Sequence, residues 1–170
     1  MTKSPLVEAT ELNDFVLESQ IGSGSFGRVF LAVLARTGEK FAMKAIRKDK
    51  LLKTKTIENT RLEMNVLMQI NHPFLCSLNY VFQSPLRLYF VMPLIAGGSL
   101  KRVFPKAVRQ PEKLAQFYIA QIIIGLGKLH ERGIVHRDLK LANIMVNMNG
   151  YIKIIDFGLS TELLSSSDLA

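Results

Sequence analysis

Cysteine is nearly absent from this sequence, because Cys76 is the only one among 170 residues. A single cysteine excludes an intrachain disulfide and any metal site built from several cysteine ligands. Structural disulfides are typical of oxidising compartments, and a chain without them fits a reducing environment. We therefore expect a cytoplasmic protein.

Long hydrophobic runs are also missing. The longest nearly unbroken apolar stretch, Phe117 to Gly127, is interrupted by Gln121 and is too short to cross a bilayer. Residues 1–14 contain no apolar core segment, so we expect no secretory signal on the chain as written and no membrane span. With 48% hydrophobic and 21% charged residues, the chain is long and apolar enough for one domain or two small lobes.

The net charge of +8 is concentrated in two basic clusters. Basic residues dominate 44–61, and a second cluster comprises Lys101, Arg102, Lys106, Arg109 and Lys113. Such clusters are either solvated faces or contacts for phosphate and acidic partners. No aromatic residue lies between Arg47 and Arg61, so a nucleic-acid partner is not expected.

Alternating and helical hydrophobic patterns divide the chain into two parts. Strands are predicted at 15–21, 28–34, 39–46, 78–83 and 87–92, with a helix at 57–70. After Gly97-Gly98 we expect a short helical piece near Leu100 and a long helix from Pro111 to Glu131, apolar on much of its surface as in a buried helix. The remainder reads as loops and short strands.

A glycine-rich segment joins the first two predicted strands. It reads Gly22-Ser23-Gly24-Ser25-Phe26-Gly27, a G-x-G-x-x-G pattern. A dinucleotide-binding fold would place a helix after it, but β-type sequence follows. A glycine hairpin allows backbone N–H groups to approach phosphates closely. The alternative is a tight turn with no ligand.

Charged residues in apolar surroundings form a second signal. Lys44 lies in an apolar strand, and Glu63 lies in the following helix among Leu62, Val66 and Leu67. Buried opposite charges on neighbouring elements indicate an ion pair that directs the lysine toward phosphates. The alternative is two long side chains whose charged ends reach solvent.

Two loops contain acid, cation and amide groups close together. The first is His136-Arg137-Asp138-Leu139-Lys140-Leu141-Ala142-Asn143, and the second is Asp156-Phe157-Gly158 after a predicted strand. Asp138 is a candidate base, whereas Asn143 and Asp156 offer the oxygen ligands that Mg²⁺ prefers. Each loop taken alone is compatible with ordinary loop chemistry.

All these elements in one order, on the expected secondary structure, resemble the eukaryotic protein kinase family. The resemblance covers about residues 14–161; Lys140 is similar to the Ser/Thr-specific form, and residues 41–75 are similar to the AGC group. It implies an α+β fold with a small five-stranded antiparallel lobe and one main helix, then a partial, mainly helical large lobe. The expected boundaries are a lead-in 1–13, an N-lobe 14–92, a hinge 93–98 and a partial C-lobe 99–170.

The resemblance implies ATP and Mg²⁺ as cofactors and a protein Ser/Thr hydroxyl as acceptor. The implied catalytic residues are Asp138, Lys140, Lys44 and Glu63, and the implied metal ligands are Asn143 and Asp156. The implied nucleotide-binding residues are Ile21, Gly22, Ser23, Gly24, Ser25, Phe26, Gly27, Val29, Ala42, Lys44, Met92, Pro93, Ile95 and Met145.

Several features depart from the AGC pattern. Pro93 replaces a hinge glutamate, although its carbonyl and the N–H of Ile95 remain for adenine. Ser99 and Ala142 replace acids that serve basic substrates, so relaxed selectivity is expected. The chain ends soon after Gly158 without A-P-E, so we expect an incomplete, inactive catalytic domain that binds a hydrophobic-motif peptide in trans. The alternative is a non-catalytic nucleotide-binding or regulatory kinase-like module.

Overall fold

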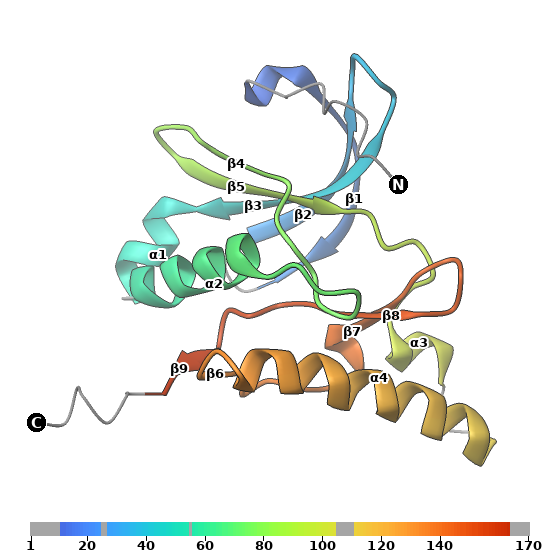
Figure 1. Cartoon of the computed structure of the whole chain (residues 1–170). Helices are drawn as coiled ribbons and strands as arrows, with labels where there is room; N and C mark the ends of the chain where they lie inside the picture. The colour runs from blue at the N-terminus through green and yellow to red at the C-terminus, as the bar shows by residue number, and fades with distance from the viewer. Residues whose placement is uncertain (1–10, 25–26, 55, 105–110, 164–170) are drawn as a thin grey trace, which may run out of the picture. The chain divides into compact units, whose positions relative to one another are not determined.

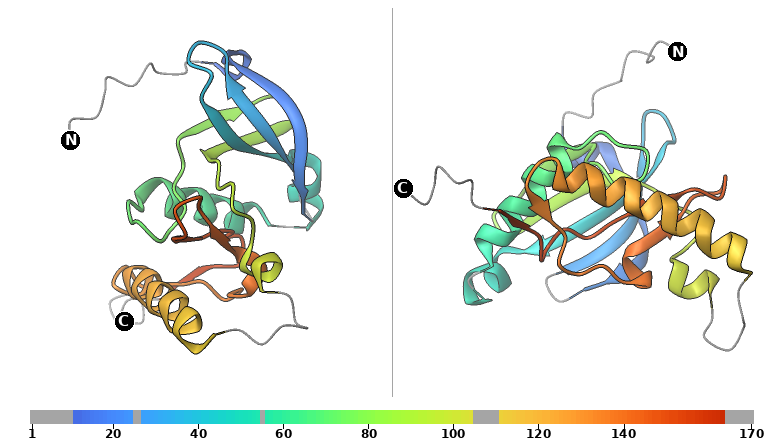
Figure 2. Two further views of the ribbon diagram at one scale, coloured as in Figure 1. Left: turned by 90° about the vertical axis from the view of Figure 1, so that its right-hand side faces the viewer. Right: turned by 60° about the horizontal axis from the view of Figure 1, so that its bottom comes forward.

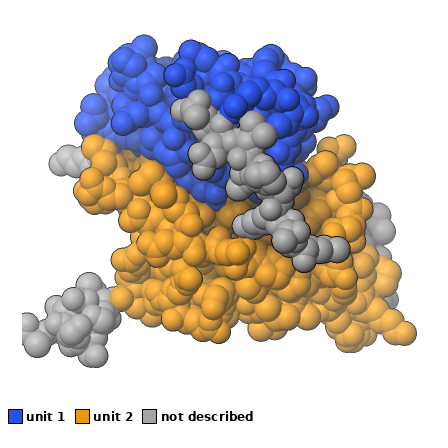
Figure 3. Space-filling view, turned by 45° about the horizontal axis from the view of Figure 1, so that its top comes forward, with its two compact units in different colours: residues 1–54, 78–94 blue, residues 55–77, 95–170 orange. Residues whose placement is uncertain are grey.

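A computed structural model describes residues 11–163 apart from 25–26, 55 and 105–110. The chain forms two compact units, residues 1–54 with 78–94 and residues 55–77 with 95–170, which are coloured separately in Figure 3. The long helix and residues 136–143 therefore lie in the second unit. Ser25 and Phe26, which the sequence assigned to nucleotide binding, lie outside the described residues.

The first unit is built on a five-stranded antiparallel sheet with strand order β1-β2-β3-β5-β4 (Figure 1). The strands are β1 Phe15–Ser23, β2 Gly27–Leu34, β3 Lys40–Arg47, β4 Tyr80–Gln83 and β5 Arg87–Pro93, and a 3₁₀ turn, η1 Leu12–Asp14, precedes them. These bounds lie within two residues of the predicted ones. The predicted five-stranded antiparallel lobe is confirmed.

The core of this unit lies on one face of the sheet. Alternate β3 residues Phe41, Met43 and Ala45 are buried, as the period of two in a strand requires. Phe15 of β1 makes edge-to-face contacts with Phe41 and with Tyr80 of β4, at centroid distances of 5.7 and 5.6 Å. Since β1 and β4 are the two edge strands, these contacts show that the sheet curls until its edges meet over the core.

A helix that the sequence analysis did not predict follows β3. Helix α1 spans Lys48–Thr54, inside the segment interpreted only as a basic cluster. Its Leu51 is buried, and the Lys48 amide and ammonium donate to the Leu86 carbonyl (3.0 Å) and to Gln83 Oε1 (3.1 Å) of the β4–β5 hairpin. One buried leucine on so short a helix gives no periodic signal, which is why the pattern missed it.

The second unit is mainly helical, with short strand pairs. Its elements are α2 Ile57–Gln69, α3 Leu100–Val103, α4 Glu112–His130, β6 Ile134–Val135, η2 Leu141–Asn143, β7 Ile144–Val146, β8 Ile152–Ile154 and β9 Thr161–Glu162. Strand β7 pairs with β8, and β6 with β9 (Figure 2). The predicted helices at 57–70, near Leu100 and at 111–131 are confirmed. In the described part of the chain, no helix is long and apolar enough to span a membrane.

Helix α2 is grouped with the second unit, whereas the sequence analysis assigned it to the N-lobe. The backbone after α2 explains this grouping, because Cys76 N–H donates to the Ile154 carbonyl of β8 (2.9 Å). Ile154 N–H in turn donates to the Phe74 carbonyl (2.8 Å). The lobe boundaries derived from the family pattern stay a prediction.

Helix α4 is buried on one side only. Tyr118, Gln121, Gly125 and Leu129 are buried, and Ile154 and Phe74 lie close to Gly125. The large apolar side chains exposed on α4 are Phe117 (43%), Ile119 (53%), Ile123 (63%) and Ile124 (53%). Hydropathy marks α4 as apolar over much of its surface, and in the described part of the chain these four side chains are left exposed.

Gln121 is the polar residue that interrupts the apolar stretch, and it holds β8 to α4. Its Oε1 accepts from Ile152 N–H (3.0 Å) and its Nε2 donates to the Phe117 carbonyl (3.1 Å). We expect Gln121→Leu to lower the free energy of unfolding by about 1–3 kcal/mol, because a buried amide loses its acceptor. Urea titration measures this loss, and Gln116→Leu, at an exposed position of the same helix, is the matched control. Equal stability of the two variants would contradict the assigned role.

Candidate active site

The glycine-rich segment joins β1 to β2, as predicted. Gly24 N–H donates to the Gly27 carbonyl (2.9 Å), and Gly27 N–H donates back (3.4 Å), so the hairpin closes across its tip. Gly22 pairs with Val29 across the strands. Ser23 is the last residue of β1 and is exposed, and Ile21 is 49% exposed.

The glycines of this hairpin differ in what surrounds them. A Cβ on Gly27 would lie 2.0 Å from the Ala45 carbonyl oxygen of β3, which no side chain tolerates. Among the described residues, a Cβ on Gly24 would meet nothing within 4 Å. Gly27 is therefore required for the close packing of the β2 and β3 backbones. Gly24 has open space beside its Cα carbon, so its backbone can be approached closely by a ligand.

Several predicted nucleotide-binding residues share one face of the first sheet. Val29 lies opposite Lys44, and Ala42 lies opposite Met92, in positions that alternate with the buried core residues of β3. Directly paired residues point to the same side of an antiparallel sheet, so these four side chains project from the face opposite the core. Pro93 ends β5.

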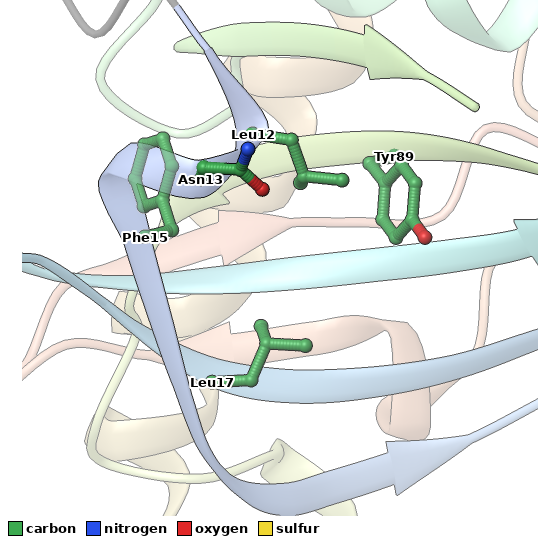
Figure 4. A pocket seen from close by; sticks show the side chains of 5 residues that line it. All are labelled: Leu12, Asn13, Phe15, Leu17 and Tyr89. Carbon is green, nitrogen blue, oxygen red and sulfur yellow. The ribbon is translucent and has the colours of Figure 1, made fainter.

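A pocket in the first unit lies elsewhere (Figure 4). It is lined by Leu12, Asn13, Phe15, Leu17 and Tyr89. None of these residues was predicted to bind the nucleotide, and Phe15 and Tyr89 belong to the core on the other face of the sheet. This pocket is therefore separate from the predicted nucleotide-binding residues.

Asp138, Lys140 and Asn143, three polar residues of the 136–143 loop, lie together in the second unit. Lys140 Nζ is 2.6 Å from Asp138 Oδ2, and Asn143 Nδ2 donates to the same oxygen (2.9 Å) and to the Asp138 carbonyl (3.0 Å). The Lys140 hydrogen bond, aided by the one from Asn143, lowers the pKa of the Asp138 carboxyl. Asp138 is thus an ionised, oriented acceptor with its second oxygen available.

His136 connects this loop to the Asp156 segment. Its Nδ1 accepts from Asp138 N–H (3.2 Å), so its Nε2 carries the proton and donates to the Ile155 carbonyl (3.2 Å). The imidazole is buried, and its ring centroid is 5.3 Å from that of Phe157. Burial lowers the pKa of His136, which keeps the ring neutral and both hydrogen bonds intact at neutral pH.

This histidine makes stability depend on pH. The unfolded chain takes up a proton below the ordinary pKa of about 6.5, while folded His136 resists it, so stability falls as pH decreases through that range. Burial also lowers the pKa of His72, which adds in the same direction. We expect the free energy of unfolding to decline between pH 7.5 and pH 5.5, by at most about 1.4 kcal/mol per pH unit for each histidine.

Urea unfolding at several pH values measures the slope, and His136→Asn should flatten it. Replacement of His130, which is exposed, serves as the control. A slope unchanged in His136→Asn would show that another group controls the pH dependence.

The candidate metal ligands are Asn143 and Asp156. The Asn143 Nδ2 bonds to Asp138 leave its side-chain oxygen for a cation, and Asn143 accepts Ile155 N–H at its backbone carbonyl (2.9 Å). Asp156 is exposed, directly after buried Ile154 of β8 and half-buried Ile155. Across the described residues, no group of three or more His, Cys, Asp or Glu side chains could hold a metal by itself. Such a sparse donor set fits Mg²⁺, which usually takes one or two protein carboxylates together with phosphate oxygens.

Glu63 of α2 is 4% exposed and lies beside the Asp156-Phe157-Gly158 segment. A Cβ built on Gly158 would be 3.5 Å from Glu63 Oε2 and 3.4 Å from Asp156 Oδ1. Both carboxylates therefore approach the same glycine.

Two further predicted nucleotide-binding residues lie in the second unit. Ile95 is half-buried at the start of this unit, and Met145 of β7 forms a bridge with Ser99.

Three structural residues were missed as functional candidates. They are Gln121, Arg132 and Lys153, which bond backbone groups far away in sequence. Lys153 had a detectable signal, a lysine among isoleucines, which is the same argument that singled out Lys44. Arg132 had none, because nothing in its neighbourhood distinguishes it from a surface arginine.

Comparison with known proteins defines the class. The model of the family described as "Protein kinase domain" matches residues 15–170, so the chain belongs to the protein kinase domain family. It is 43% identical to mouse protein kinase C eta type over 89% of its length and 41% identical to Dictyostelium discoideum protein kinase 3 over 94%. It is also 39% identical to Drosophila melanogaster atypical protein kinase C over 98%.

These relatives confirm the predicted AGC-like Ser/Thr kinase resemblance. Their names include protein kinase C, a putative ribosomal protein S6 kinase and a RAC family serine/threonine-protein kinase homolog. The chain spans 22% of the mouse relative, 18% of protein kinase 3 and 28% of the fly relative. The match therefore concerns a kinase-domain segment of much longer proteins.

Proposed function

We propose that this chain supplies the nucleotide-binding and catalytic-loop residues of an ATP-dependent protein Ser/Thr kinase. The observation that carries the proposal is the Asp138 carboxylate, which one cation and one amide orient through the same oxygen. Phosphoryl transfer relies on positioning and electrostatic stabilisation, and this arrangement offers both.

In this proposal Asp138 orients the acceptor hydroxyl and takes its proton. Lys140, 2.6 Å from Asp138, neutralises the charge that develops on the γ-phosphate. Lys44 contacts the α- and β-phosphates with Glu63 as its acidic partner. Asn143 and Asp156 hold Mg²⁺, which when bound offsets phosphate charge.

The glycine hairpin covers the phosphates, and apolar residues of the sheet border the adenine. The residues assigned to the adenine are Ile21, Val29, Ala42, Met92 and Met145. The hinge offers the Pro93 carbonyl and the Ile95 N–H as backbone groups for the base. The protein substrate, the reduced preference for basic peptides that follows from Ser99 and Ala142, and docking of a hydrophobic-motif peptide in trans are further parts of this proposal.

Nucleotide binding provides the direct test. Mg·ATP is expected to raise the melting temperature of the 170-residue chain, because a ligand of the native state stabilises it by mass action. At 100 times the dissociation constant the gain is about 2.7 kcal/mol. Lys44→Met and Asp156→Asn should each reduce the gain in thermal-shift titrations.

The control is Lys128→Met, which removes a lysine that pairs with Glu131 on the surface of α4. A gain unaffected by Lys44→Met and Asp156→Asn would contradict the assignment. Binding without transfer to protein substrates would support the non-catalytic nucleotide-binding alternative for the chain as it stands.

A further inference from the structure

A half-buried lysine on β8 has no role in the site as described above. Lys153 Nζ donates to the carbonyls of His72 (3.1 Å) and Leu75 (3.0 Å). Within the described parts of the chain the structure pairs it with no carboxylate, and burial lowers the pKa of its ammonium. A partly desolvated ammonium satisfied mainly by carbonyl dipoles is costly, and an uncharged side chain of similar length would avoid that cost.

The carbonyls that Lys153 binds belong to the exit of α2. We use "the exit loop" for residues 70–76, which follow the last helical residue, Gln69. The last carbonyls of a helix lack intrahelical partners and carry partial negative charge, which here applies to Gln69, whereas His72 and Leu75 lie three and six residues further along the chain. Helix α2 has no basic residue in its own last turn. Arg132, from just beyond α4, donates to the Gln69 carbonyl (2.9 Å).

The exit loop also touches the strand that leads to Asp156. Cys76 and Phe74 exchange backbone hydrogen bonds with Ile154, and Leu75 forms a parallel bridge with it. On the following residue, Ile155 N–H donates to the Asn143 carbonyl, and the Ile155 carbonyl accepts from His136. The backbone after α2 thus meets β8, the strand that contains Lys153 and leads to Asp156.

We propose that Lys153 and Arg132 act as positioning residues that hold the exit of α2, and through it Glu63, in a fixed place relative to Asp156. The two cations bind three carbonyls on one short segment, from Gln69 to Leu75, and we call this arrangement the exit clamp. It rests on the proposed function, in which Glu63 and Asp156 both serve Mg·ATP. Hydrogen bonds from a charged donor are directional, so they fix the path of the backbone more tightly than apolar packing does.

The test compares Lys153→Met, Lys153→Arg, Arg132→Met and the control Lys128→Met with the unaltered chain. The dissociation constant for Mg·ATP is measured by calorimetry below the melting temperature of each protein, and amide exchange of residues 66–77 by mass spectrometry. We expect Lys153→Met to weaken Mg·ATP binding about tenfold, because it removes both charge-assisted hydrogen bonds to the exit loop and part of their free energy serves to position Glu63. It should also speed exchange in the exit loop. Lys153→Arg should restore most of the affinity, and Arg132→Met should act in the same direction.

Each outcome decides the matter. A merely structural role lowers the melting temperature but leaves the dissociation constant of the folded protein unchanged, and that result in both Lys153→Met and Arg132→Met overturns the proposal. If Lys153→Met does not fold, Arg132→Met, at an exposed position, decides alone. If the unaltered chain does not bind Mg·ATP, the proposed function fails. The exit clamp is then tested by exchange alone, and unchanged exchange in the variants overturns it.

Discussion

Gly27→Ala is expected to disrupt the first unit. The new methyl carbon would lie 2.0 Å from the Ala45 carbonyl oxygen and 2.9 Å from its carbon, both in the backbone of β3. Neither atom can move without separating β2 from β3, which pair over residues 27–33 and 40–46. We expect a loss of more than about 3 kcal/mol, the upper end of the usual cost of overpacking. Thermal unfolding followed by circular dichroism measures it.

Gly24→Ala is the matched control, since its new methyl would meet no atom of the described residues within 4 Å. It should leave the melting temperature of the free protein nearly unchanged and reduce only the stabilisation by Mg·ATP. The pair separates two roles within one motif, one in packing and one in covering the nucleotide. Equal melting temperatures of the two variants would contradict the packing role of Gly27.

Self-association through α4 is the second large effect that we expect. Phe117, Ile119, Ile123 and Ile124 are 43–63% exposed on one helix, and burying the exposed part of each would gain about half of the roughly 1.5–3 kcal/mol of a fully exposed apolar side chain. The 170-residue chain should therefore associate at micromolar to millimolar concentration. The double variant Ile119→Glu with Ile123→Lys should be monomeric and equally stable, because it replaces exposed side chains and adds a favourable i,i+4 pair. Sedimentation velocity over a concentration series measures the change.

The control for this experiment adds the same two charges to another helix. Asn65→Glu with Gln69→Lys changes exposed polar positions of α2 with the same i,i+4 spacing and leaves the apolar residues of α4 intact. It should associate like the unaltered chain. A monomeric unaltered chain, or association that persists in the isoleucine variant, would show that this face of α4 does not drive assembly.

Elements with a strong periodic pattern were predictable from the sequence. The five strands and helices α2 and α4 were predicted close to their observed bounds, since each repeats its pattern over several residues. Helix α1 and the two-residue strands β6 and β9 were not, because they are too short for a period to show. Hydropathy marks α4 as apolar but does not report which of its residues are covered, since that depends on the neighbouring elements.

The candidate site was predicted from motifs, and its supporting residues were not. Spacing alone brings Asp138, Lys140 and Asn143 into one loop, so their proximity could be expected. Lys153 and Gln121 act through backbone groups 78 and 31 residues away in sequence. Every residue has a backbone carbonyl, so the residue type does not reveal which backbone group a side chain will bond. The three-dimensional structure is needed to identify these backbone partners.

Two residues of the candidate site have backbone angles that glycine tolerates better. Among the described non-glycine residues, only Arg137 (φ 60°) and Asp156 (φ 65°) have positive φ. An L-residue in this conformation costs roughly 1–3 kcal/mol. Arg137 donates from Nε to the Leu159 carbonyl (2.7 Å), and Asp156 presents an exposed carboxylate. Laboratory evolution under selection for heat resistance alone would therefore favour glycine at position 156, whereas selection that also requires nucleotide-dependent function would retain aspartate there.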